Sequence, residues 1–166
     1  MSKNIVLIGM PGSGKTTVGS LIAKKLLMEF IDMDISLVKR KKMTVAEMFA
    51  ISEEFFRNAE TEYAMELCNK NSLVISTGGG IVKRKENIDY LKQNSIIIFI
   101  NRSVENIISD IDINSRPLLK ENIDNIYKLY NERIELYKKY CDIEILNEGT
   151  IDETAEKIIS TVITKL

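Results

Sequence analysis

The sequence has no histidine and no tryptophan, and only two cysteines and two prolines among its 166 residues. Without histidine, a general base at neutral pH has to be a carboxylate, a lysine or the substrate itself, and a histidine-based catalytic triad is excluded. Cys68 and Cys141 lie far apart, in no metal-binding or redox spacing. We therefore expect two reduced thiols and a cytoplasmic location.

The sequence also lacks long apolar runs and an excess of charge of either sign. Its longest apolar run, Ile96–Ile100, is far too short to cross a bilayer, and Met1–Lys3 leads directly into a strand-like segment rather than a secretory leader. The formal net charge is -1, whereas a general nucleic-acid binder would be strongly basic. We expect small-molecule substrates, no nucleic acid or membrane partner, and a monomer.

Short apolar segments alternate with segments of helical periodicity along the whole chain. Strands that are apolar throughout are typical of a parallel sheet covered on both faces by helices. The expected strands are Asn4–Ile8, Phe30–Asp32, Leu73–Ser76, Ser95–Ile100 and Ile143–Leu146. The expected helices are Thr16–Leu27, Ser36–Lys42, Val45–Phe49, Glu53–Lys70, Lys85–Gln93, Ser103–Ile111, Ile123–Tyr140 and Ile151–Leu166. The pattern predicts one α/β domain over residues 1–166, with a surface loop at Asp112–Asn122 as a candidate lid.

The segment Gly9–Thr16 matches the phosphate-binding pattern G-x-x-x-x-G-K-[ST] in full. Its glycines allow backbone N–H groups to surround a phosphate, and the helix that follows adds its dipole. Lys15 would hold the β- and γ-phosphates of ATP, and Thr16 would offer its hydroxyl to Mg²⁺. The alternative is a simple glycine-rich turn, but an expected strand before it and a helix after it favour phosphate binding.

Two further polar segments follow expected strands, at the edge of the sheet where ligands bind. Asp32 and Asp34 are two residues apart, so on an extended segment both carboxylates would point towards the phosphate site. One could act through Mg²⁺ or as a base, and the other could hold an acceptor hydroxyl. The segment Thr77–Gly80 would allow a ligand to approach the backbone closely. The alternative for Asp32 and Asp34 is an ordinary acidic loop beside a strand, and the alternative for Thr77–Gly80 is a glycine linker.

Arginine is rare, with only six of the 23 basic residues. Its planar fork binds carboxylate or phosphate in bidentate fashion, so three positions are of interest. Arg57 is followed one helical turn later by Glu60, which could orient it. Arg116 lies in the candidate lid and Arg133 in the helix after it. Taken singly, each could be an ordinary surface charge; the case for them is joint.

Together these segments resemble the shikimate kinase family along nearly the whole chain. The family's P-loop, its Asp-x-Asp, its Phe-Arg-x-x-Glu and its triple glycine are similar to segments of this sequence in the same order. So are its Arg-Pro-Leu-Leu lid signature and its late arginine helix. The matching segments are Gly9–Thr16, Asp32–Asp34, Phe56–Glu60, Gly78–Gly80, Arg116–Leu119 and Glu132–Asp142.

The resemblance implies a fold, a reaction and a set of residue roles. The fold is a P-loop kinase of the nucleoside-monophosphate-kinase type, a three-layer α/β/α domain with a five-stranded parallel sheet and a mobile lid. The reaction is transfer of the ATP γ-phosphoryl group to the 3-hydroxyl of shikimate, in aromatic amino-acid biosynthesis, with Mg²⁺ and an acceptor segment at about 33–61. ATP contacts would come from Gly12, Ser13, Gly14, Lys15, Thr16, Thr17 and Arg116. Shikimate contacts would come from Asp34, Arg57, Gly79, Gly80 and Arg133. Mg²⁺ would be served by Thr16 and Asp32, and catalysis by Lys15, Asp34 and Arg116.

The sequence also departs from the family. The arginine that usually precedes the lid and helps to hold adenine is absent, and Ser109 and Asp110 occupy its neighbourhood. We therefore assign no adenine contact. Other functions stay open at this point: a gluconate or nucleoside-monophosphate kinase of the same fold, or a nucleotide-binding regulatory protein without turnover.

Overall fold

A computed structural model describes residues 3–110 and 119–165 of the chain. The strands form one sheet in the order β2-β3-β1-β4-β5, and every neighbouring pair is parallel. The strands are β1 (Asn4–Ile8), β2 (Glu29–Asp32), β3 (Leu73–Ser76), β4 (Ser95–Asn101) and β5 (Ile143–Leu146). This confirms the predicted five-stranded parallel sheet, with each strand end within one residue of its expected place.

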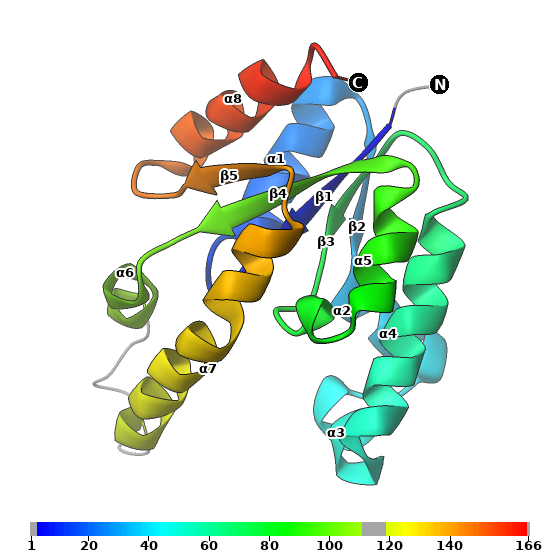
Figure 1. The fold of residues 1–166 in the computed structure, drawn as a ribbon, viewed down its shortest axis with the longest axis vertical. Coiled ribbons are helices and arrows are strands. Elements are labelled where there is room, and N and C mark those ends of the chain that lie inside the picture. The colour runs from blue at the N-terminus through cyan, green and yellow to red at the C-terminus, as the bar shows by residue number, and fades with distance from the viewer. Residues whose placement is uncertain (1–2, 111–118, 166) are drawn as a thin grey trace.

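Helices cover both faces of the sheet (Figure 1). They are α1 (Lys15–Leu26), α2 (Met33–Lys41), α3 (Val45–Ile51), α4 (Glu53–Leu67), the short 3₁₀ helix η1 (Ile81–Lys83), α5 (Lys85–Lys92), α6 (Val104–Ser109), α7 (Leu119–Tyr140) and α8 (Ile151–Val162). Within the described ranges, no helix is both long and apolar enough to span a membrane.

The two faces of the sheet bury separate apolar cores. Along β1, Ile5 and Leu7 face one core, formed with α1 and α8, and Val6 and Ile8 face the other, formed with α2, α4, α5 and α7. All four side chains are fully buried. Alternate burial on both faces explains why the strands are continuously apolar in the sequence. Figure 1 shows the resulting three layers, with α1 and α8 side by side on one face.

Side-chain caps set where several helices begin. Thr44 forms a capping box with Glu47 at the start of α3, and Ser52 accepts a hydrogen bond from Phe55 N at the start of α4. Asp32 caps α2, so this helix begins at Met33 rather than at the expected Ser36. The helical prediction was therefore wrong at this boundary, and the error bears on the site.

The prediction of the lid loop was also wrong at its C-terminal end. Residues 119–122 belong to α7, which begins at Leu119, and are not part of a loop. The rest of the expected lid, residues 112–118, lies outside the described residues, and so does Arg116. The carboxyl ends of β1, β2 and β3, with the segments that follow them, therefore carry the described part of the site.

Candidate active site

The loop Gly9–Thr16 leads from the end of β1 into α1, and three of its glycines have positive φ angles. The values are +148° at Gly9, +78° at Gly12 and +97° at Gly14, a region that residues with a side chain rarely adopt. A Cβ atom on Gly9 would also lie 2.5 Å from the Ile100 carbonyl oxygen. The loop thus has the backbone shape and the helix N-terminus that bind phosphate.

The Lys15 side chain folds back onto the start of this loop. Its Nζ atom donates hydrogen bonds to the carbonyl oxygens of Gly9 at 2.9 Å and Met10 at 2.8 Å, and the residue is only 7% exposed. Burial lowers the pKa of Lys15 to about 8, although the nearby carboxylates of Asp34 and Asp32 act to raise it. The ammonium group is therefore desolvated and ready to exchange backbone carbonyls for phosphate oxygens.

Three side-chain oxygens meet beside the first turn of α1. The Thr16 hydroxyl donates to Asp32 Oδ2 at 2.7 Å and lies 3.2 Å from the Ser76 hydroxyl at the end of β3. Hydroxyl and carboxylate oxygens are suitable ligands for Mg²⁺. No group of three or more His, Cys, Asp or Glu within the described ranges could hold a metal alone. A Mg²⁺ ion here would take its remaining ligands from water and phosphate, as this ion commonly does.

Asp34 reaches the site by a different route from the one expected. It lies in the first turn of α2 and not on an extended segment, so the alternation of strand side chains does not apply to it. It nevertheless acts electrostatically on Lys15, and a Cβ atom on Gly78 would lie 2.9 Å from Asp34 Oδ1. Burial raises the pKa of Asp34 and the Asp32 carboxylate raises it further, whereas Lys15 and Arg57 lower it.

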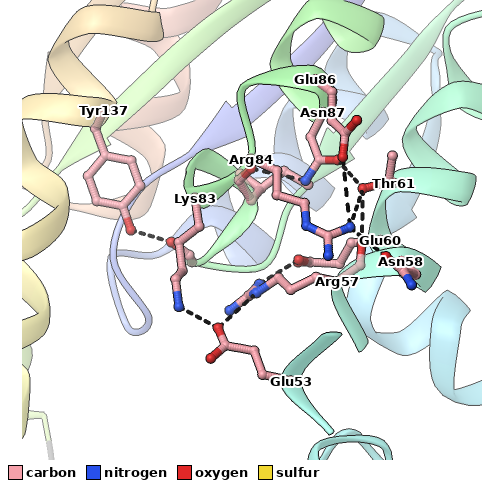
Figure 2. Close-up of polar contacts among 12 residues, drawn as sticks. Glu53, Arg57, Asn58, Glu60, Thr61, Lys83, Arg84, Glu86, Asn87 and Tyr137 are labelled. Atoms are coloured by element: carbon pink, nitrogen blue, oxygen red, sulfur yellow. Dashed lines mark hydrogen bonds and ion pairs between the residues drawn. The ribbon is translucent and has the colours of Figure 1, made fainter. Parts of the chain in front are cut away.

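Two carboxylates of α4 hold the Arg57 guanidinium (Figure 2). Its Nη1 atom donates to Glu60 at 2.5 Å and its Nε atom donates to Glu53 at 3.3 Å, so the orienting role predicted for Glu60 is confirmed. Glu53 also accepts a hydrogen bond from Lys83 of η1. A Cβ atom on Gly80 would lie 2.4 Å from Arg57 Nη2, so the guanidinium packs directly on the glycine segment. Burial raises the pKa of Glu60 and Arg57 lowers it.

Arg133 lies on α7, which packs against η1 directly after the same glycine segment. Its charge acts on Lys15 and on Glu60, and its Nε atom is buried without a hydrogen-bond partner among the described residues. One turn later, the buried Tyr137 hydroxyl donates to the Gly79 carbonyl oxygen at 2.5 Å (Figure 2). Burial raises the pKa of Tyr137 to about 12, although Arg133 acts to lower it. A buried guanidinium nitrogen without a partner is a vacant donor for a ligand.

The sequence did not single out Glu53, Lys83 or Tyr137 as site residues. The signals were present in the helical spacing: Glu53 lies four residues before Arg57, and Tyr137 lies four residues after Arg133. The contact with Lys83 depends on the packing of η1 against α4 and has no local signal.

A second region lies on the other side of the P-loop, in a cavity of about 430 Å³. It begins at the first turn of α1 and is bounded by the end of β4 and by the loop between β5 and α8. Its lining residues include Gly12, Thr16, Thr17, Arg102, Asp110, Asn147, Gly149 and Ile151. The sequence did not single out Arg102. The structure places it beside Asp110, the position near which the family's adenine-binding arginine is missing.

The other two described arginines lie outside both regions. Arg40 forms a bidentate pair with Glu66 and lies over the Tyr63 ring. Arg84 donates to Asn58 Oδ1 at 2.7 Å. The described site thus combines a phosphate loop with the buried Arg57, the half-buried Arg133 and the Asp34 carboxylate. Asp34 and Arg133 both act electrostatically on Lys15.

The order of these segments along the chain corresponds to a known family. A family model described as shikimate kinase matches residues 11–163. The chain belongs to the shikimate kinase family. A relative in Clostridium botulinum named shikimate kinase is 47% identical over 163 residues, which cover 98% of this chain and 99% of that protein.

Solved structures agree with the family assignment. The shikimate kinase from Acinetobacter baumannii, solved in complex with shikimate, has 31% identity and a TM-score of 0.89, over 99% of this chain and 95% of that one. A gluconokinase from Sinorhizobium meliloti has a TM-score of 0.61 over 98% and 97% of the two chains, but only 11% identity. Its likeness shows a common fold and nothing about the acceptor.

Proposed function

We propose that this protein is a shikimate kinase, which transfers the γ-phosphoryl group of ATP to the 3-hydroxyl of shikimate and releases ADP and shikimate 3-phosphate. The reaction belongs to aromatic amino-acid biosynthesis. Membership of the family supports the activity. The observation that carries the choice of acceptor is the pair of arginines beside the glycine segment: Arg57 packs on Gly80, and Arg133 lies one turn before Tyr137, which bonds Gly79, and acts electrostatically on Lys15.

The acceptor chemistry fits this arrangement. A carboxylate needs planar, charge-assisted donors, and Arg57 and Arg133 supply two guanidinium groups with unused N–H donors. The hydroxyls of shikimate need acceptors, which Asp34 supplies together with the backbone of Gly79 and Gly80. Because Glu53 and Glu60 hold Arg57 before any ligand arrives, the acceptor meets a pre-organised site.

Phosphoryl transfer depends on alignment and charge neutralisation more than on strong acid–base chemistry. We assign the ATP phosphates to Gly12–Thr17, with Lys15 on the β- and γ-phosphates. Asp34 orients the acceptor hydroxyl and takes its proton as the new O–P bond forms and the bond to the β–γ bridging oxygen breaks. The family resemblance also assigns Arg116 to phosphate neutralisation, and this residue lies outside the described part of the chain.

Thr16 and Asp32 are the residues that would hold Mg²⁺, the latter through water, and their hydroxyl and carboxylate oxygens suit this ion. When bound, Mg²⁺ would supply positive charge to the phosphates. Ser76 would complete the polar wall in place of the aspartate that many P-loop proteins carry after this strand.

We also propose that the protein acts as a cytoplasmic monomer on small molecules alone. The two cysteines lie far apart, in no metal-binding or redox spacing, which supports a reducing cytoplasmic environment. The near-neutral formal charge of -1 supports the absence of a nucleic-acid partner.

The experiment that tests the proposed reaction is product analysis. The purified protein is incubated with Mg²⁺, ATP and shikimate, and the products are identified by ³¹P NMR. We expect one ADP for each phosphate monoester formed, with the phosphate on the 3-oxygen. Hydrolysis of ATP without ester formation, or an ester at another oxygen, would contradict the proposal.

A further inference from the structure

Arg102 lies at the end of β4, in the wall of the cavity beside the P-loop, and has no part in the reaction described above. The first turn of α1 forms one end of this cavity, so the phosphates of a nucleotide would lie there. The rest of the nucleotide has to extend along the cavity, between Arg102 and the loop that follows β5. Arg102 is therefore the basic side chain of this wall that the nucleoside would meet.

Two contacts at a single nitrogen hold the Arg102 guanidinium among the described residues. Its Nη1 atom donates to the Gly12 carbonyl oxygen at 3.2 Å and to Asp110 Oδ2 at 2.5 Å. A guanidinium carries five N–H donors in one plane, and these two contacts use the two at a single nitrogen. Its remaining donors make no hydrogen bond within residues 3–110 and 119–165, so we take them as donors for a ligand. Asp110 is more exposed than its partner, with 61% of its side chain accessible against 21% for Arg102.

The loop after β5 contributes shape rather than charge to the lining of the same cavity. Asn147 uses both ends of its amide within the protein, because Nδ2 donates to the Ser13 carbonyl and Oδ1 accepts from the Thr154 hydroxyl. Gly149 and Ile151, which follow it, present backbone and an aliphatic side chain. A flat group in this cavity that contacted both these residues and the guanidinium would be held by packing and by a cation. Purine rings bind well to such surfaces, because arginine stacks on aromatic faces.

We infer that Arg102 binds the nucleoside part of ATP by stacking its guanidinium on the base, and that Asp110 is the positioning residue that holds it there. The inference rests on the proposed function, because it requires the ATP phosphates to lie in the loop Gly9–Thr16. It also explains how a chain with an aspartate at position 110 can keep a cation beside the base.

Calorimetric titrations with ATP and with inorganic tripolyphosphate test the inference, because only ATP has a base. Both ligands carry the triphosphate chain, so we use the dissociation constant of tripolyphosphate divided by that of ATP as the measure of the nucleoside contact. For Arg102→Met we expect ATP binding to weaken about tenfold more than tripolyphosphate binding. Arg102→Lys keeps the positive charge but not the planar guanidinium, so most of the same decrease in the ratio should appear in this variant. Equal weakening of both ligands, or no change in either, would overturn the inference.

The role of Asp110 has its own test. In Asp110→Asn the ratio should fall by about threefold, whereas adding the same change to Arg102→Met should have no further effect, because the positioned group is gone. An effect of equal size in both backgrounds would contradict a positioning role. Arg40→Met is the matched control, because Arg40 forms a similar pair with Glu66 away from the cavity, and it should leave the ratio unchanged.

These titrations are independent of the acceptor. Thermal unfolding of each variant shows whether it is folded, and binding of nucleotide is measured without shikimate. If the proposed reaction fails but Arg102→Met loses ATP selectively, the inference survives as a nucleotide contact. If shikimate is phosphorylated and the ratio does not change, the inference alone is wrong.

Discussion

The Tyr137 hydroxyl donates a hydrogen bond to the Gly79 carbonyl oxygen at 2.5 Å and thereby ties α7 to the glycine segment after β3. The ring is fully buried and stacks on Phe99, with 5.1 Å between ring centroids. Arg133 lies one turn earlier on the same helix. The contact therefore holds Arg133 at a set distance from the glycine segment, on which Arg57 packs.

Replacing Tyr137 by phenylalanine removes this tie and keeps the ring. We expect the free energy of unfolding to fall by about 0.5–1.5 kcal/mol, and the KM for shikimate to rise several-fold while the KM for ATP stays within twofold. Steady-state kinetics and denaturant unfolding measure the two effects. Tyr140→Phe, one turn away on the same helix, is the control. A loss of stability with both KM values unchanged would make Tyr137 a packing residue only.

Arg133→Ala should affect the acceptor far more than the nucleotide. A lost buried contact between charged groups costs roughly 2–5 kcal/mol, so the KM for shikimate should rise about thirtyfold or more. The exposed Lys139 on the same helix gives the control variant Lys139→Ala. An increase confined to the KM for ATP would show that Arg133 serves the phosphates and not the acceptor carboxylate.

Removing Glu60 should damage both stability and acceptor binding, because it leaves the Arg57 guanidinium buried with one carboxylate fewer. Breaking such a buried pair costs roughly 3–5 kcal/mol of stability. Glu60→Gln keeps the shape and a hydrogen-bond acceptor, so it should lose less stability than Glu60→Ala but still raise the KM for shikimate. Chemical denaturation and kinetics measure these effects, with the exposed Glu62→Ala as the control. If Glu60→Ala and Glu62→Ala change stability and the KM for shikimate equally, Glu60 does not hold Arg57 in place for the acceptor.

Binding of ATP should be accompanied by proton uptake just above pH 8. The pKa of Lys15 is lowered to about 8 in the free protein, mainly by burial, and phosphate oxygens beside the ammonium group will raise it. At about pH 8.5 the free protein is therefore partly deprotonated at Lys15 and becomes protonated on binding. Calorimetry in buffers of different ionisation enthalpy measures the uptake. Lys15→Met should lack it, and equal uptake in both proteins would assign the proton to another group.

The same pKa has a consequence for stability. Because the folded-state pKa lies below the ordinary value of 10.5, the unfolded chain binds more protons between about pH 8 and 10.5. Through this group, stability therefore increases as pH rises across that window. The buried charge costs stability at neutral pH, a cost that Lys15→Met should remove.

The sheet could be predicted from the sequence because its signals are local. Residues such as Ile5 and Val6 face opposite cores, so each strand appears as a continuous apolar run. The P-loop and Glu60 were predictable for the same reason, since motif spacing and helical spacing determine their contacts.

A local helix cap and a long-range contact limited the rest of the prediction. One carboxylate oxygen of Asp32 accepts a hydrogen bond from the backbone N–H of Ile35. Because of this cap, α2 begins three residues earlier than expected, and Asp34 lies on a helix. The pairing of Arg102 with Asp110 also required the end of β4 to lie beside Gly12, ninety residues away in the chain. No spacing within the sequence indicates such a contact.

The most direct test of the central claim is a coupled assay of ADP formation with ATP, Mg²⁺ and a panel of acceptors. The panel contains shikimate, gluconate and nucleoside monophosphates, with the Arg57→Ala variant assayed in parallel. We predict that kcat/KM for shikimate exceeds that for every other acceptor by at least about a hundredfold, and that this preference collapses in Arg57→Ala. Turnover with gluconate or a nucleotide but not with shikimate would contradict the account.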